Sequence, residues 1–168
     1  MVEKNAVLYC CYNRPEIVIR SIIHLNNSSI NKIYIFRDGP KNNIKDKINC
    51  EKVAKIIKNF KFECKVVYKI NQKNLGCRLG IQRAINWFFR NEKQGIILED
   101  DIIPTKNFFG FMNYCLERYK DDTRIMMISG TNYLGSNVRS NKYFYSEHFL
   151  IWGWATWRRA WKKYDPNT

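Results

Sequence analysis

Short apolar runs and amphipathic helical patterns alternate along most of this chain. The apolar runs are rich in β-branched and aromatic residues and lie at 6–12 (within the opening segment 2–12), 32–37, 64–70, 96–98 and 124–129. Between them, apolar residues recur at spacings of three and four, which is the period of a helix. Parallel strands need a crossover connection, and that connection is usually a helix. The alternation therefore predicts an α/β fold with a mainly parallel central sheet flanked by helices.

Composition describes a globular chain. Its 168 residues, 45% of them hydrophobic, are enough for one domain with a sizeable core. No apolar run is long enough to cross a bilayer, and the start, MVEKNAVLYC, lacks the plan of a signal peptide. The six cysteines form no CxxC pair and no zinc spacing. We therefore expect a protein of the reducing cytoplasm.

The chain is strongly basic, with 29 Lys and Arg against 15 Asp and Glu and a formal net charge of +14. Such a charge attracts polyanions. The lysines are scattered rather than gathered in one tract, so we interpret much of this charge as a solvated surface. We expect no nucleic-acid partner.

Three adjacent acids end one of the buried runs, in the segment GIILEDDIIP at 95–104. Carboxylates packed as closely as Glu99, Asp100 and Asp101 repel one another unless a cation or hydrogen-bond donors hold them. Mg²⁺ or Mn²⁺ suits this position, since such an ion bridges one or two carboxylates to substrate phosphates. An acidic turn leading into the next helix is the alternative interpretation.

Polar loops follow the predicted strands and would open on one edge of a parallel sheet, where ligands bind in α/β folds. Arg14 or Arg78 could hold phosphate oxygens with a bidentate fork. Asp38 could accept the imide N–H of a uracil. Alternatively, the arginines pair with nearby carboxylates and Asp38 begins the turn at Gly39. The loops that would meet there are 12–14, 37–39, 74–78, 99–101 and 130–132.

Other nucleotide-binding motifs are missing from the sequence. There is no GxGxxG after the first strand and no GxxxxGK[ST], which argues against dinucleotide and P-loop folds. His24 and His148 lack the spacing of metal ligands.

The ordered motifs FRDGP, ILEDDIIPTKNFFGFM, SGTN and IWGWATW resemble those of GT-A type glycosyltransferases. The branch in question includes N-acetylglucosaminyltransferase I and related bacterial nucleotide-diphospho-sugar transferases. The similarity spans nearly the whole chain. It implies one GT-A (Rossmann-like) domain over 1–168, with a nucleotide-sugar-binding part at 1–132 and the start of an acceptor-side part at 133–168.

The resemblance also implies a UDP-sugar donor and Mn²⁺ or Mg²⁺. It implies that Asp101 coordinates the metal, that Glu99 touches the donor sugar and that Asp100 lies near the ribose. The residues implied to contact the nucleotide and its phosphates are Tyr12, Asn13, Arg14, Asp38 and Arg78, with Asp38 at the uracil.

The catalytic base is where this chain departs from the family pattern. Inverting members use a carboxylate base, which in the related N-acetylglucosaminyltransferases follows the Gly-Trp segment in a WDD-like stretch. Here only Glu147 and Asp165 are nearby acids, and the resemblance implies a base beyond Thr168. We therefore expect an acceptor side that is cut short, and a chain that can be inactive by itself.

The aromatic segment near the end of the sequence has helical spacing. Trp154, Trp157 and Trp161 would share one helix face, which we interpret as core; a platform for an acceptor sugar or a surface covered by a further segment are the alternatives. The segment KYFYS at 142–146 is expected to be a strand. Four cations on the same predicted helix could rest on anionic lipid: Arg158, Arg159, Lys162 and Lys163.

The hypothesis from sequence is a cytoplasmic glycosyltransferase that could contact an anionic membrane peripherally. It would use a metal-bound UDP-sugar to glycosylate a glycan or glycolipid acceptor with inversion. One alternative is a sugar-nucleotidyltransferase, although the loop after the first strand (12–15) lacks the glycines expected there. The other is a non-enzymatic domain that binds polyanions.

Overall fold

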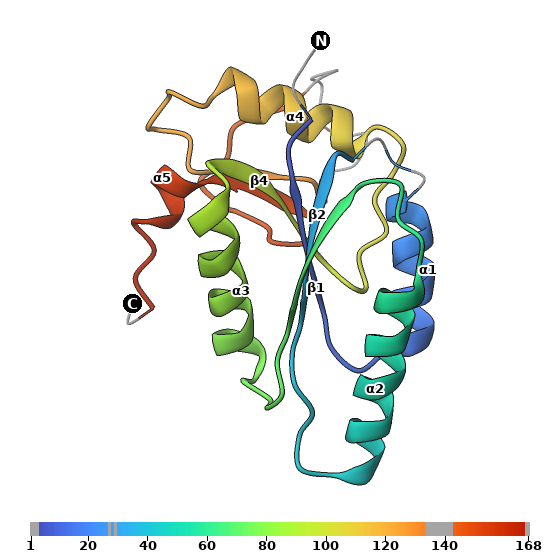
Figure 1. Ribbon diagram of the computed structural model, residues 1–168. Helices are drawn as coiled ribbons and strands as arrows, with labels where there is room; N and C mark the ends of the chain where they lie inside the picture. Colours follow the sequence, from blue (N-terminus) through green and yellow to red (C-terminus); the bar gives the residue numbers. More distant parts are fainter. Residues whose placement is uncertain (1–3, 27, 29, 134–142, 167–168) are drawn as a thin grey trace.

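The computed structural model describes residues 4–26, 28, 30–133 and 143–166. Strands and helices alternate as the sequence predicts through the first four strands (Figure 1). The elements are β1 (Val7–Cys11), α1 (Pro15–Asn26), β2 (Lys32–Arg37), α2 (Ile44–Asn59), β3 (Lys65–Ile70), α3 (Cys77–Asn91), β4 (Gln94–Glu99), α4 (Phe108–Arg118), β5 (Met127–Ser129), β6 (Trp154–Trp157) and α5 (Arg158–Trp161).

The six strands form one sheet in the order β3-β2-β1-β4-β6-β5. Strands β1 to β4 are mutually parallel, whereas β6 runs antiparallel to both β4 and β5. The predicted α/β fold with a mainly parallel sheet is therefore confirmed. Because β5 and β4 both oppose β6, β5 also ends at the edge where β1, β2 and β4 end.

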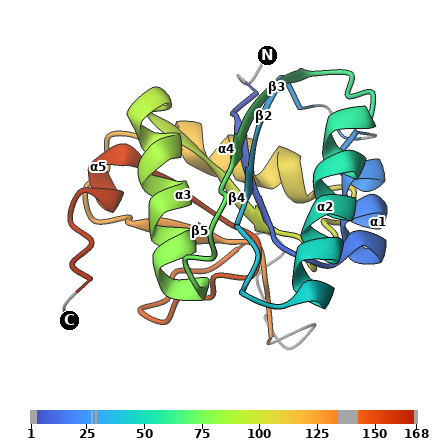
Figure 2. The same cartoon turned by 60° about the horizontal axis from the view of Figure 1, so that its bottom comes forward.

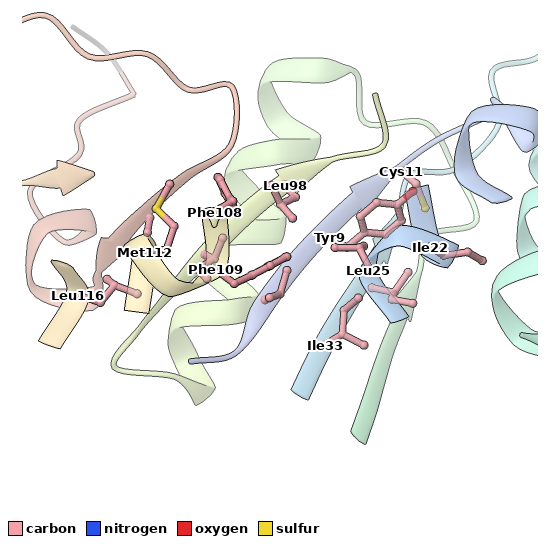
Figure 3. Close-up of a cluster of buried hydrophobic side chains, with 14 of the residues drawn as sticks. Tyr9, Cys11, Ile22, Leu25, Ile33, Leu98, Phe108, Phe109, Met112 and Leu116 are labelled. Atoms are coloured by element: carbon pink, nitrogen blue, oxygen red, sulfur yellow. The ribbon is translucent and has the colours of Figure 1, made fainter. Parts of the chain in front are cut away.

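Helices cover both faces of the sheet (Figure 2). Apolar side chains of α1, α2 and α4 form one core cluster with the sheet, and α3 forms the other. Figure 3 shows part of the first cluster, in which Tyr9 and Leu98 of the central strands lie with Ile22 and Met112 of the covering helices. All of β1 is buried, which agrees with a strand covered on both faces.

The tryptophan segment differs from the sequence prediction. Residues Trp154 to Trp157 form strand β6, paired with β4 and β5, and not a helix. Residues three apart in a strand face opposite sides, so Trp157 joins the cluster of α4 while Trp154 packs with Trp161 against that of α3. The helical spacing was misleading because sheet pairing on both edges decides the conformation. The three tryptophans still pack in or against the core, as we expected.

The predicted strand KYFYS is also wrong for the part that the structure describes. Residues 143–146 are not in a strand, and Lys142 lies outside the described residues. The hydroxyl groups of Tyr143 and Tyr145 instead meet that of Tyr119 at the end of α4, at 2.8 and 2.6 Å.

Two of the four cations expected to face lipid donate hydrogen bonds to backbone carbonyls instead. Arg159 donates to four backbone carbonyls, those of Tyr119, Lys120, Asp122 and Ile125. Arg158 donates to the carbonyl of Glu92 after α3. Helix α5 ends at Trp161, so Lys162 and Lys163 follow it rather than belong to it. In the described part of the chain, no helix is both long enough and apolar enough to span a membrane.

Candidate functional site

A cavity of about 270 Å³ opens at the carboxyl ends of β1, β2 and β4, beside the start of α3. The strand order reverses next to β1, since β2 and β3 lie on one side of it and β4 on the other. Ligands of open α/β sheets bind at such a switch point. The lining residues that bear on its chemistry are Tyr12, Arg14, Asp38, Lys41, Glu99 and Asp100.

The acids after β4 lie at this cavity, and Arg14 pairs with two of them. Arg14 donates through one terminal nitrogen to Oδ1 of Asp100 and through the other to Oδ2 of Asp101, at 3.1 Å for the latter. The Asp100 side chain is only 3% exposed and that of Asp101 is 54% exposed. The second oxygen of Asp100 is buried and has no hydrogen-bond partner among the described residues.

Two of these carboxyls are poorly stabilised as anions. Burial raises the pKa of Glu99, and the neighbouring charges of Asp101 and Asp100 raise it further. Burial also raises the pKa of Asp100, although Arg14 partly opposes that effect. A further cation at this position would relieve both.

The acids suit a metal ion that is held partly by a bound ligand, rather than one held by protein side chains alone. Within the described ranges, no group of three or more His, Cys, Asp or Glu side chains could hold a metal ion. Mg²⁺ and Mn²⁺, however, are commonly held by one or two carboxylates together with substrate phosphates. The unpartnered oxygen of Asp100 and the exposed carboxylate of Asp101 match that donor set.

Asp38 holds the loop after β2 against the loop after β3. Its carboxylate accepts hydrogen bonds from the backbone N–H groups of Gly39 and Leu75 and from the side-chain amides of Asn71 and Asn74. These contacts agree with the alternative that Asp38 organises a turn. Its predicted contact with a uracil stays a prediction.

Asp46, which sequence reasoning missed, supports the loop that carries Arg14. It is buried near the start of α2 and accepts hydrogen bonds from the Tyr12 hydroxyl, the Asn13 amide and the Lys41 backbone N–H. Its own N–H is accepted by the N-cap Asn43. The only sequence signal was the N-cap pattern Asn-x-x-Asp, which by itself indicates a helix start.

The beginning of α3 adds positive potential to the cavity. Gly76, with φ of 75°, precedes the helix, and its first turn contains no acidic residue. The exposed N–H groups of a helix start favour anions. Arg14 and Lys41 also line the cavity, and these cationic groups suit a phosphate group.

Three predicted site residues lie away from the cavity lining. Arg78 is exposed and donates to the carbonyl of Pro166, so the C-terminal segment passes beside the start of α3. Glu147 and Asp165 are both exposed. Tyr12, Arg14, Asp38, Glu99 and Asp100 do line the cavity. Asn13 and Asp101 lie outside its lining as well; Asn13 donates to Asp46, and Asp101 accepts from Arg14.

Comparison with known proteins gives no family. No family model and no curated protein matches the chain. A mannosyltransferase, PcManGT from Pyrobaculum calidifontis in complex with GDP-Man and Mn²⁺, has a TM-score of 0.49 and 10% identity, over 74% of this chain and 34% of that one. UTP-bound UGPase from Acinetobacter baumannii has a TM-score of 0.42 and 12% identity, over 76% and 57%.

The chain thus spans 34% of the length of the first structure and 57% of the second. Both TM-scores, 0.49 and 0.42, are below the level at which a shared activity can be argued. The function has to be argued from the residues of this chain.

Proposed function

We propose that this chain is the donor-binding part of a metal-dependent glycosyltransferase. The donor is a UDP-sugar, the metal is Mn²⁺ or Mg²⁺, and the acceptor is a glycan or glycolipid that attacks with inversion. The observation that carries this proposal is one cavity, at the switch point of a mainly parallel sheet, that joins Arg14 to the acids at the end of β4. The resemblance of the motifs supports the same reaction class.

The donor would lie with its charged end at the acids. Asp101, assisted by Asp100, would hold the metal, which stabilises negative charge on the departing diphosphate as a Lewis acid. Arg14 and the start of α3 would bind the phosphates, and Glu99 would contact the sugar. The nucleobase would occupy the end formed by Phe36 and Ile81 of the cavity lining, next to the loop that Asp38 organises.

The acceptor side lies in 133–168 in this proposal. Glu147 and Asp165 are its candidate bases. An acceptor carried on lipid would bring anionic head groups near the cations at 158–163. Lys162 and Lys163 would meet the head groups, whereas Arg158 and Arg159 already donate to backbone carbonyls.

Two other functions remain as alternatives with different products or ligands. A sugar-nucleotidyltransferase would join UTP to a sugar 1-phosphate and release pyrophosphate, whereas a glycosyltransferase releases UDP. A polyanion-binding domain would bind RNA or DNA with an affinity that falls steeply with salt and needs no divalent metal.

Thermal unfolding with a panel of nucleotides tests the proposal. UDP with Mn²⁺ should raise the melting temperature in proportion to the logarithm of its concentration, and UDP without metal should raise it far less. GDP with Mn²⁺ is the control for the base. Stabilisation by RNA alone, with none by UDP and Mn²⁺, would support the polyanion-binding alternative instead.

Product analysis then separates the two enzymes. ³¹P NMR of the chain with Mn²⁺ and UDP-sugars should show slow release of UDP as the sugar is transferred to water or to an added acceptor. Pyrophosphate formed from UTP and a sugar 1-phosphate would assign the nucleotidyltransferase reaction.

A further inference from the structure

Arg14 connects the basic and the acidic groups of the cavity. Its two terminal nitrogens donate to two different carboxylates, those of Asp100 and Asp101. These are the acids that the proposed function assigns to the metal. Resting on that function, we propose that Arg14 is an exchangeable counter-ion, which neutralises the acids in the empty site and moves to the donor diphosphate when a divalent cation takes its place.

Competition for the same oxygens is the first reason. A divalent cation on Asp100 and Asp101 would face a guanidinium already bound to one oxygen of each, and the two positive groups repel. The second oxygen of Asp100 is buried and has no hydrogen-bond partner in the part of the chain that the structure describes, and Asp100 lines the cavity. It offers the cation a contact that Arg14 does not use.

The freedom of the Arg14 side chain is the second reason. That side chain is 44% exposed, so it can move without opening the core. Its backbone is fixed, because α1 begins at Pro15 and the Arg14 carbonyl accepts from the N–H of Val18. The guanidinium lies at the cavity, and its planar fork matches phosphate oxygens as well as carboxylates.

This arrangement couples the two ligands. The cation releases Arg14 from the acids, and the diphosphate gives the released guanidinium a new partner. Each ligand therefore raises the affinity for the other, and by linkage the two factors are equal. Mn²⁺ alone and UDP alone should both bind weakly, because each alone leaves one charge without a partner.

Binding of Mn²⁺ in the absence of nucleotide tests the inference without any activity assay. Free Mn²⁺ is followed by electron paramagnetic resonance in wild type and in Arg14→Gln. The variant should bind Mn²⁺ about tenfold more tightly, within the usual range of coupling between sites. In saturating Mn²⁺ the same variant should bind UDP about tenfold more weakly, so that the mutual enhancement is lost.

Arg20→Gln is the matched control. Arg20 is exposed on α1, the helix that begins directly after Arg14, and takes part in none of the ion pairs of the described residues. The substitution Arg20→Gln removes the same charge as Arg14→Gln. If both variants bound Mn²⁺ more tightly by the same factor, the lower net charge alone would explain the effect and the inference would be overturned. Circular dichroism checks folding; if Arg14→Gln does not fold, Arg14→Lys, which reaches one acid at a time, should give a smaller tightening.

Failure of the inference and failure of the proposed function have different results. If wild type binds UDP with Mn²⁺ but Arg14→Gln leaves the affinity for Mn²⁺ alone unchanged or weaker, the counter-ion role is wrong and the donor site stands. If wild type binds neither Mn²⁺ nor UDP with Mn²⁺, both are wrong.

Discussion

Asp46 joins the loop of Arg14 to the loop after β2, because it accepts hydrogen bonds from Tyr12 and Asn13 and from Lys41. Replacing it with Asn keeps the size and removes the charge that three donors share. Hydrogen bonds to a buried charged group contribute about 1.5–3 kcal/mol, so we expect the free energy of unfolding to fall by about 2 kcal/mol at pH 7. Urea denaturation measures it.

The pH dependence of that loss is specific. Burial acts to raise the pKa of Asp46, but hydrogen bonds from Tyr12, Lys41 and Asn13 outweigh it and the pKa is lowered. The contribution is therefore complete above the ordinary aspartate pKa of about 3.9 and is lost as the pH falls through the lowered value. The difference between wild type and Asp46→Asn should shrink below about pH 4; a constant difference would contradict this role.

Glu99 should show the opposite sign. Its pKa is raised by burial and by the two neighbouring acids, so the folded protein holds the proton more strongly than the unfolded chain does. Stability from this group is present below the ordinary glutamate pKa, about 4.3, and is lost as the pH rises through the raised value.

Glu99→Gln removes that cost. The variant should melt a few degrees higher than wild type at pH 8 without divalent metal, which corresponds to about 1 kcal/mol in a chain of this size. At pH 4 the variant and wild type should melt at the same temperature. Circular dichroism in the presence of a chelator measures both. A lower melting temperature of the variant at pH 8 would show that the charged form is stabilised by the fold.

At the scale of elements, the two loops at the cavity mouth are in contact through a glycine. A Cβ added to Gly39 would lie 2.2 to 2.4 Å from backbone atoms of Lys73. Gly39→Ala should therefore push the loops after β2 and β3 apart, at a cost of about 3 kcal/mol, and weaken nucleotide binding.

Gly110→Ala is the matched control for that substitution. Gly110 lies within α4, and an added Cβ would meet nothing within 4 Å. Alanine is the better helix former by about 1 kcal/mol, so this variant should be more stable. If urea denaturation gave both variants the same sign, the close contact at Gly39 would not be the cause.

At the scale of the whole molecule, local pattern predicted most of the sheet. The prediction for β2 matches the structure at both ends, and the others through β4 start and end within a few residues. This success has a physical cause: strands covered on both faces must be apolar throughout, and their covering helices must be amphipathic. Both constraints act on residues that are close together in the sequence, so a local pattern reveals them.

Contacts distant in sequence were not predictable in the same way. The spacing of Trp154, Trp157 and Trp161 fits a helix. Pairing with residues far earlier in the sequence makes 154–157 a strand: Gln94 pairs with Trp157, 63 residues later, and Met127 with Thr156, 29 residues later. The ion pairs of Arg14 and the contacts of Asp46 likewise join segments that the sequence keeps apart. The convergence of the loops was predictable from topology, but the partners within it were not.

The most direct test of the account is a calorimetric titration with UDP, with and without Mn²⁺, on wild type and Asp101→Asn. Asp121→Asn, which removes the same charge at an exposed position after α4, is the control. UDP should bind wild type and the control much more tightly with Mn²⁺ than without it, and Asp101→Asn should weaken the binding with Mn²⁺ at least tenfold, about 1.4 kcal/mol, without unfolding the chain. Equal affinity of wild type and Asp101→Asn for UDP, or no dependence on Mn²⁺, would contradict it.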